Sequence, residues 1–346
     1  MAADHSIPSS GAGCSSSGEF TSFVDLASER IGGRAIAAND DFFAPKRNLV
    51  KAAAPVFIPD KFTSRGKWMD GWESRRRRTP GYDWCVVKLG VRGRIRGVNV
   101  CTKFFTGNFP TSCSIDALDT SRVVGSELAA TAGAPWTAIL PKTDLRGDSD
   151  NFLDVESDAP WTHVRLNIFP DGGVARLRVF GHAVVDWERL AARGTLIDLA
   201  RIEHGGLVLA ASDMHYGAKD NIIMPGRAAN MGDGWETKRR RGPGHDWLIL
   251  RLGAAGRIRK IEIDTNHFKG NYPESASVDA CCSQEVGGLD GSSWTELLPR
   301  TKLHAHRRHF FSRELRDVGA ITHLRLNIFP DGGVSRFRAY GTLAAD

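Results

Sequence analysis

The sequence has no long hydrophobic run, and nothing in it approaches the ~18 consecutive apolar residues that cross a membrane. Its N-terminus also lacks the apolar segment of a secretory signal and runs instead into a Ser/Gly tract. These absences exclude an integral membrane protein and favour a soluble, cytoplasmic one, with an organelle as the alternative. We expect residues 1–20 to form a disordered lead, because so polar a tract buries too little surface to order itself.

Cysteine is scarce, and none of the six cysteines forms a C-x-x-C pair with metal-binding spacing. The sequence also has no Gly-rich phosphate loop before a helix and no G-x-S-x-G nucleophile motif. The sequence therefore identifies no cofactor. A divalent metal stays possible as an alternative, although no recognisable ligand motif encodes its site. In the absence of a secretory signal we expect free thiols rather than disulfides.

Neither sign of charge is strongly in excess. Among 346 residues, Lys plus Arg number 46 and Asp plus Glu number 40, which gives a net charge of +6. This balance permits an anionic ligand and does not favour nucleic acid as a partner. Glycine, in contrast, is abundant at 37 residues. Because glycine is costly inside helices and common in turns, its abundance favours a β protein with many loops.

The most informative feature is an internal duplication. The segments 162–181 and 322–341 are identical at fifteen of twenty positions, and shorter matches follow in the same order along both halves. We therefore expect two copies of one domain. The predicted division is a first repeat at 21–183, a linker at 184–197 and a second repeat at 198–346.

The two repeats differ in length at one place. The offset between matching residues falls from 173 to 163 between Asn48 and Asp70, which indicates an insertion in the first repeat. The inserted part contains Pro55–Pro59, and we expect it to be a loop. None of the cysteines aligns with a cysteine of the other repeat, so a duplicated disulfide framework is not expected.

Short runs of alternating apolar and polar residues predict strands. Residues 95–100 and 164–169 alternate in this way, and so do their copies in the second repeat. The Pro-Asp-Gly-Gly segment after the second run predicts a hairpin-like turn into the next strand. The expected fold class is all-β, with two tandem jelly-roll β-sandwiches. Apolar spacing over 184–193 predicts a short linker helix that ends at Gly194.

One group of residues occurs in both repeats and combines acids, arginines and tryptophans. Asp70-Gly-Trp-Glu leads through four arginines to Pro-Gly-Tyr-Asp-Trp84, and Asp233-Gly-Trp-Glu begins the copy. A nearby acid could serve as a general acid or base, and Arg binds carboxylates with defined geometry. The candidate catalytic residues are Asp70, Glu73, Asp233, Glu236 and His245.

We expect the binding residues in the same segments and in the Gly-Asn-aromatic-Pro turns at 107–110 and 270–273. Two other interpretations stay open. A basic run is also typical of a solvated loop, a nuclear-localisation signal or an RNA patch, and a tryptophan is equally typical of a core anchor. The candidate substrate-binding residues are Arg76, Arg77, Arg239, Arg240, Trp72, Trp235, Asn108 and Asn271.

Three histidines of the second repeat, His215, His245 and His267, stand where the first repeat has an aromatic residue. Neutral imidazoles bind metals and move protons near pH 7. The pattern predicts either a site specific to the second repeat or simple drift of the sequence.

Taken together, these segments resemble the allantoicase family. The resemblance rests on Leu26–Gly33, Lys67–Arg76, Phe104–Pro110 and both Arg-Leu-Asn-Ile-Phe-Pro-Asp-Gly-Gly blocks, and it covers about residues 22–343. It implies two galactose-binding-like jelly rolls and hydrolysis of allantoate to ureidoglycolate and urea in purine breakdown. It also implies a homo-oligomer, with a hexamer as one known arrangement. It carries over no established catalytic residues.

The substrate implied by this resemblance is a carboxylate with two ureido groups on a single carbon. We expect acid–base catalysis by the acids named above, with an arginine anchoring the carboxylate. The alternative function is a non-catalytic tandem binding module for a glycan or another anionic ligand. A nucleic-acid-binding role, which rests only on the two basic runs, comes third.

Overall fold

The computed structural model describes residues 19–121, 134–283 and 293–344. Residues 1–18 of the expected lead lie outside these ranges. Its last two residues, Glu19 and Phe20, belong instead to a short 3-10 helix, η1 (Glu19–Ser22), and Phe20 is only 4% exposed. The folded part of the first repeat therefore begins before residue 21.

The two repeats contain corresponding elements in the same order, except that β3 and β4 occur only in the first repeat and η6 only in the second. Those of the first repeat are β1 (Val24–Asp25), η2 (Glu29–Ile31), β2 (Arg34–Ala38), η3 (Lys46–Val50), β3 (Phe62–Thr63), β4 (Gly66–Lys67), β5 (Trp72–Glu73), β6 (Asp83–Cys101), β7 (Ser112–Leu118), β8 (Thr137–Asp144), β9 (Asp150–Asp154), β10 (Pro160–Phe169), β11 (Gly173–Val174) and β12 (Arg176–Ala183). Those of the second are β13 (Ile197–Asp198), η4 (Ile202–His204), β14 (Leu207–Ala211), η5 (Lys219–Ile223), η6 (Met231–Asp233), β15 (Trp235–Glu236), β16 (Asp246–Asp264), β17 (Ser275–Cys281), β18 (Thr295–Lys302), β19 (Arg308–Phe311), β20 (Ile321–Phe329), β21 (Gly333–Val334) and β22 (Arg336–Leu343).

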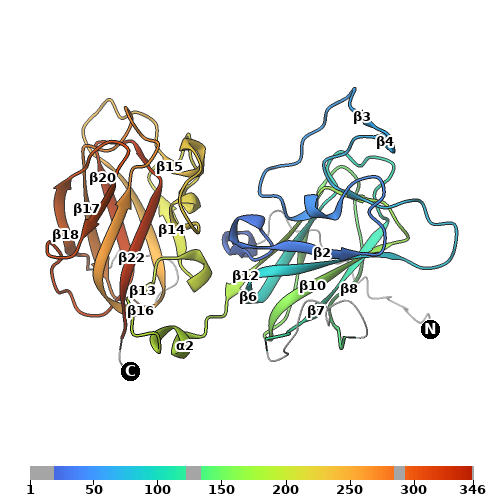
Figure 1. Cartoon of the computed structure of the whole chain (residues 1–346), viewed down its shortest axis with the longest axis horizontal. Coiled ribbons are helices and arrows are strands. Elements are labelled where there is room, and N and C mark those ends of the chain that lie inside the picture. The colour runs from blue at the N-terminus through green and yellow to red at the C-terminus, as the bar shows by residue number, and fades with distance from the viewer. Residues whose placement is uncertain (1–18, 122–133, 284–292, 345–346) are drawn as a thin grey trace, which may run out of the picture. The chain divides into compact units, whose positions relative to one another are not determined.

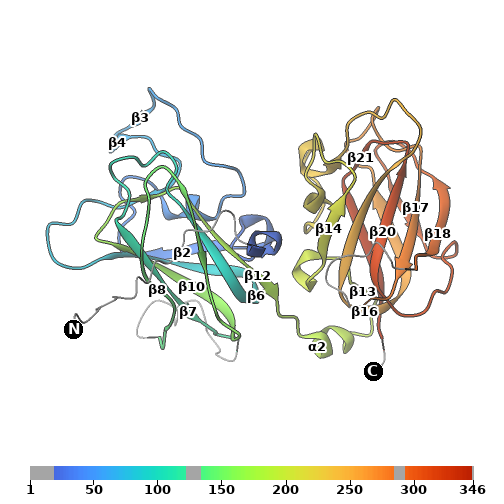
Figure 2. The same ribbon diagram turned by 180° about the vertical axis from the view of Figure 1, so that it is seen from behind.

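Each repeat is a β-sandwich organised around one strand of 19 residues, β6 in the first and β16 in the second (Figure 1, and from behind in Figure 2). The first part of β16 pairs with β14 and with most of β20. Its second part pairs with β19 and β22. The long strand therefore contributes to both layers and joins them. The first repeat follows the same strand order, β1-β12-β6-β10-β7-β8, with β2 and β9 also paired to β6.

The alternating runs are strands, as predicted, and their apolar side chains form the core. Ile95, Val98 and Val100 of β6 are all fully buried, and so are Leu166 and Ile168 of β10. These observations confirm the all-β class and the two tandem sandwiches.

The predicted hairpin around Pro-Asp-Gly-Gly is wrong. β10 and β12 do not pair with each other, because β6 lies between them. After β10 the chain forms the two-residue strand β11, which pairs with β5. Asp171 in this turn accepts a hydrogen bond from the backbone N of Arg77 at 2.8 Å, so the turn is fastened to a distant segment. The same arrangement recurs in the second repeat, where β21 pairs with β15.

The predicted linker helix is confirmed as α2 (Trp187–Ala191). Asp186 caps it, because its carboxylate accepts a hydrogen bond from the backbone N of Arg189 at 2.9 Å. The chain divides into two compact units, with the change near residues 181 and 182. The finer bounds 184–197 stay a prediction. No helix of the described residues is long and apolar enough to cross a membrane.

Candidate active site

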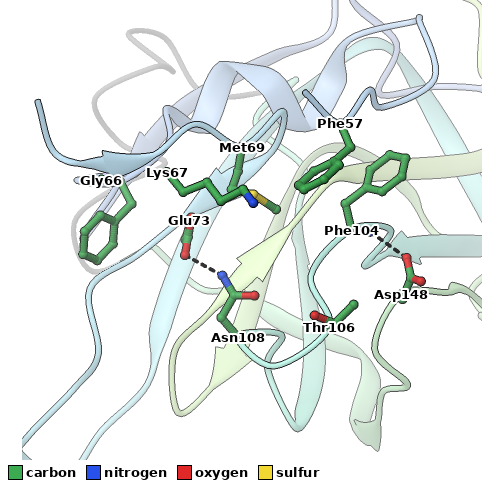
Figure 3. A pocket seen from close by; sticks show the side chains of 10 residues that line it. Phe57, Gly66, Lys67, Met69, Glu73, Phe104, Thr106, Asn108 and Asp148 are labelled. Atoms are coloured by element: carbon green, nitrogen blue, oxygen red, sulfur yellow. Dashed lines mark hydrogen bonds between the residues drawn. The ribbon is translucent and has the colours of Figure 1, made fainter. Parts of the chain in front are cut away.

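A cavity of about 390 Å³ lies in the first repeat, within the size range of small-molecule sites. Its wall combines aromatic side chains with polar and charged ones (Figure 3). The lining residues are Phe43, Phe57, Gly66, Lys67, Met69, Glu73, Phe104, Thr106, Asn108 and Asp148. Two residues predicted from the sequence, Glu73 and Asn108, are among them.

The strand β5 turns Glu73 toward this cavity. Successive side chains of a strand point to opposite faces, so Trp72 enters the core while Glu73 faces the other way. The Trp72 ring is fully buried, and its Nε1 donates a hydrogen bond to the backbone oxygen of Asp40 at 2.8 Å. Trp235 is buried and bonded in the same way to Asp213. Rings enclosed like this present no face to a ligand, so both tryptophans are core anchors.

Asn108 holds the carboxyl group of Glu73. Its Nδ2 donates a hydrogen bond to Oε1 of Glu73 at 2.7 Å, as the dashed line in Figure 3 shows. Burial raises the pKa of Glu73 above its ordinary value, although the hydrogen bond from Asn108 acts in the opposite direction. A carboxyl group with a raised pKa keeps its proton closer to neutral pH, which suits it to donate and then accept a proton.

The opposite wall is formed by residues with an unusual backbone. Phe104 has φ 69° and Asp148 has φ 49°, in the left-handed region that bulky residues rarely adopt. The backbone N of Phe104 donates a hydrogen bond to Oδ1 of Asp148 at 2.8 Å. Phe57 stacks on the Phe104 ring, with centroids 5.7 Å apart and planes 21° apart. These contacts fix the wall of the cavity that lies opposite Glu73.

The insertion of the first repeat supplies the remaining wall. It was expected to be a loop, but part of it is a short hairpin in which Phe62 pairs with Lys67. Four of the lining residues, Phe57, Gly66, Lys67 and Met69, come from between Asn48 and Asp70. The longer segment of the first repeat thus supplies four of the ten lining residues.

The candidate acid Asp70 does not line the cavity. It is 7% exposed and accepts hydrogen bonds from Nη2 of Arg176 at 2.7 Å and from Nζ of Lys51 at 2.8 Å. Burial raises its pKa, but the bonds from Lys51 and Arg176 outweigh this and hold the pKa below the ordinary value. Asp70 also accepts a hydrogen bond at 3.2 Å from the backbone N of Val56, which connects it to the insertion. These contacts make Asp70 a structural residue.

Asp233, the copy of Asp70, is held in the same manner. Its Oδ2 accepts hydrogen bonds from Nη2 of Arg336 at 2.9 Å and from the backbone N of Ala229 at 3.0 Å. These contacts give Asp233 a structural role.

The predicted arginines are likewise not among the lining residues. Arg77 forms an ion pair with Asp83 at 2.6 Å, and Arg240 pairs with Asp246. Arg76 and Arg239 are not buried. The basic runs therefore form ion pairs with aspartates through Arg75, Arg77 and Arg240, while Arg76 and Arg239 are exposed.

The second repeat keeps part of the arrangement. Asn271 donates a hydrogen bond to Glu236, which matches the Asn108–Glu73 pair. At the position of Phe104 stands His267, whose backbone N donates to Nδ1 of His306 at 2.8 Å. The backbone scaffold is therefore duplicated, while the side chains around it differ.

His245 lies elsewhere in the second repeat. Its Nε2 is 3.2 Å from Oδ1 of Asn327, and its ring packs on Phe329 with centroids 4.6 Å apart. His215 and His267 have other partners. Within the described ranges no group of three or more His, Cys, Asp or Glu residues is placed to hold a metal ion. The histidine pattern thus does not converge on one site.

Sequence reasoning missed Lys67 and Asp148 as lining residues. The usable signal for Lys67 was the change of offset between the repeats, because extra chain in one copy marks where that copy differs in structure. Asp148 carried no local signal, since it reaches the cavity through a turn far along the chain from Glu73.

Two copies of one β-sandwich, with a candidate cavity in the first, define a tandem β-sandwich protein. The family model described as the allantoicase repeat matches residues 24–184 and 197–344. A probable allantoicase of Burkholderia mallei is 50% identical over 332 residues, which cover 94% of this chain and 96% of that protein. A probable allantoicase of Photobacterium profundum is 49% identical, covering 93% and 97%.

The solved structures agree with these matches. The crystal structure of allantoicase from Saccharomyces cerevisiae has a TM-score of 0.79 and 35% identity, and the match covers 93% of this chain and 96% of that one. The chain belongs to the allantoicase family.

Proposed function

We propose that the protein hydrolyses allantoate to ureidoglycolate and urea, and that the reaction takes place in the cavity of the first repeat. Membership of the family supports the reaction. The observation that carries the assignment of the site is Glu73, a carboxyl group with a raised pKa that faces a cavity of suitable size.

Releasing urea breaks the bond between the central carbon and one ureido nitrogen. Protonated Glu73 donates its proton to that nitrogen, while the other ureido nitrogen supplies an electron pair to the carbon. The Glu73 carboxylate then removes a proton from water as the water oxygen bonds to the carbon. The hydroxyl group ends on ureidoglycolate, the proton ends on urea, and Glu73 returns to its starting form.

Asn108 is a positioning residue in this scheme. Because its Nδ2 donates a hydrogen bond to Oε1 of Glu73, we assign the proton transfers to the other oxygen, Oε2. The arginine anchor expected from the sequence is not retained, since Arg77 and Arg240 already pair with aspartates of their own segments.

The reaction is tested by incubating the purified chain with allantoate and measuring urea and ureidoglycolate. Equal amounts of both products, formed in proportion to enzyme, support the proposal. Absence of urea together with binding on a glycan array would instead support the alternative of a tandem binding module.

We also propose that the chain forms a homo-oligomer, with a hexamer as one arrangement. Membership of the allantoicase family supports this proposal. Light scattering coupled to size-exclusion chromatography tests this, and a monomer at micromolar concentration would contradict it.

A cytoplasmic location is a further part of the proposal. None of the five cysteines in the described part of the chain forms a disulfide, and four of them are buried. Free thiols are typical of a reducing compartment. Fractionation of cells that produce the protein tests this location.

A further inference from the structure

We infer that Lys67 binds the carboxylate of the substrate and so selects a carboxylate over an uncharged ureide. The inference rests on the proposed function, because it concerns the same cavity. It assigns to the inserted hairpin the anchoring role that the sequence suggested for an arginine.

Lys67 is the one cation among the described residues that line the cavity. Its Nζ lies 4.6 Å from the centroid of the Phe57 ring. Two other lysines of the first repeat have acidic partners: Lys51 pairs with Asp70 at 2.8 Å, and Lys103 pairs with Asp150 at 2.7 Å. Over the ranges that the structure describes, no carboxylate lies in ion-pair distance of Lys67. Its charge is therefore available to a ligand.

The charges of the cavity wall make such a cation necessary. Glu73 and Asp148 both face the space, and an ionised acid on either wall would repel an anionic substrate. Figure 3 shows Lys67 reaching from the hairpin toward the middle of the cavity, above Glu73 and Asn108. In a partly enclosed space its attraction for a carboxylate is stronger than in bulk water.

This placement also orients the substrate. A carboxylate held by Lys67 leaves the two ureido groups of the same carbon to face the polar groups of the wall. One of them then meets Glu73, where the proton transfer is needed. An ammonium group suits this task, because its three N–H groups can donate hydrogen bonds to a carboxylate in several orientations.

The second repeat has an uncharged residue at the position aligned with Lys67. At the offset of 163 that aligns Asp70 with Asp233, the position of Lys67 corresponds to Asn230. The Glu236–Asn271 pair therefore lacks both the hairpin and its charge.

The test measures competitive inhibition of urea release by two small ligands. One is ureidoacetate, which has one ureido group and a carboxylate, and the other is its uncharged amide. In Lys67→Met the inhibition constant of ureidoacetate should rise about 10- to 100-fold, as expected for loss of a hydrogen-bonded charge. That of the amide should change less than about threefold. Lys67→Arg should restore most of the preference for the acid.

Lys61 provides a matched control. It lies in the same insertion with its Nζ 4.1 Å from the Trp68 ring centroid, and it does not line the cavity. Lys61→Met should leave both inhibition constants unchanged. If Lys67→Met retains too little activity for inhibition kinetics, direct calorimetric titration of the two ligands gives the same comparison.

Three results would overturn the inference: unchanged binding of ureidoacetate in Lys67→Met, equal weakening of the acid and the amide, or the same effect from Lys61→Met. A wild-type protein that releases no urea from allantoate would contradict the proposed function instead. Calorimetric titration of the two ligands with that protein would still test the role of Lys67.

Discussion

Asn108 donates a hydrogen bond to Glu73 at 2.7 Å, and Asn271 donates the equivalent bond to Glu236 in the second repeat. The pair itself is therefore a shared property of the fold. What differs is its surroundings, since only the first pair has the inserted hairpin beside it. This contrast gives most of the experiments an internal control.

The first prediction concerns Glu73. Glu73→Gln should lower kcat for allantoate by about 100-fold or more, because an amide cannot transfer the proton that a general acid–base residue supplies. Glu236→Gln should leave kcat within about twofold. Steady-state urea release by the two variants measures both effects. A large loss in Glu236→Gln with activity kept in Glu73→Gln would move the site to the second repeat.

The second prediction concerns pH. Protonated Glu73 starts the reaction, so kcat/KM should fall as pH rises through its raised pKa. The hydrogen bond from Asn108 lowers that pKa, and therefore Asn108→Ala should raise it further and move the fall to higher pH.

The midpoint of the pH profile, rather than its height, reports this effect, because Asn108→Ala also removes a lining side chain. Asn271→Ala serves as the control and should leave the profile in place. A midpoint that moves to lower pH in Asn108→Ala would show that Glu73 is not the titrating acid.

The third prediction concerns stability. Asp70→Asn should lower the free energy of unfolding by about 3 kcal/mol, because it leaves the buried Arg176 without its charge partner. The folded-state pKa of Asp70 is depressed. Its contribution is therefore present above the unfolded pKa of about 3.9 and is lost as pH falls through the lower folded value.

Urea denaturation at neutral and acidic pH measures this difference between wild type and Asp70→Asn. The exposed Asp60, in the insertion between Asn48 and Asp70, is the control. Asp60→Asn should change the free energy of unfolding by less than about 0.5 kcal/mol. Equal stability of Asp70→Asn and wild type at neutral pH would rule out a structural role for this carboxylate.

The fourth prediction concerns the packing beneath the cavity. A Cβ at Gly173 would lie 2.0 Å from Cε1 of the buried Phe105. Gly173→Ala should therefore destabilise the first repeat by about 1–3 kcal/mol through overpacking. A Cβ at Gly107 would meet no atom within 4 Å, so Gly107→Ala is the matched control for the thermal melt. A melting temperature unchanged in both variants would contradict the close packing of Phe105.

The fold followed from the sequence to the extent that local pattern determines it. Alternation over 95–100 reports a strand with a buried face, and the apolar spacing before Gly194 reports a helix. Neither pattern says which strand lies beside which. The incorrect prediction of a hairpin between β10 and β12 arose for this reason. The strand that lies between them, β6, ends 68 residues before Phe169, at Cys101, and begins 86 residues before it, at Asp83.

The site was predicted in part for the same reason. Glu73 and Asn108 were found because the duplication repeats their segments. Trp72 and Asp70 lie in the same segment, but alternation along β5 and the distant Arg176 place them in the core. Whether an acid meets a cavity or a buried arginine depends on residues far away in sequence, and composition alone does not encode that choice.

The inserted hairpin has an evolutionary consequence. If the hairpin confines the substrate to the first repeat, selection for catalysis acts on the first repeat. Selection on the second repeat then acts mainly through stability. The replacement of Phe104 and Asp148 by His267 and His306 on an otherwise preserved backbone is the outcome expected from such unequal constraint.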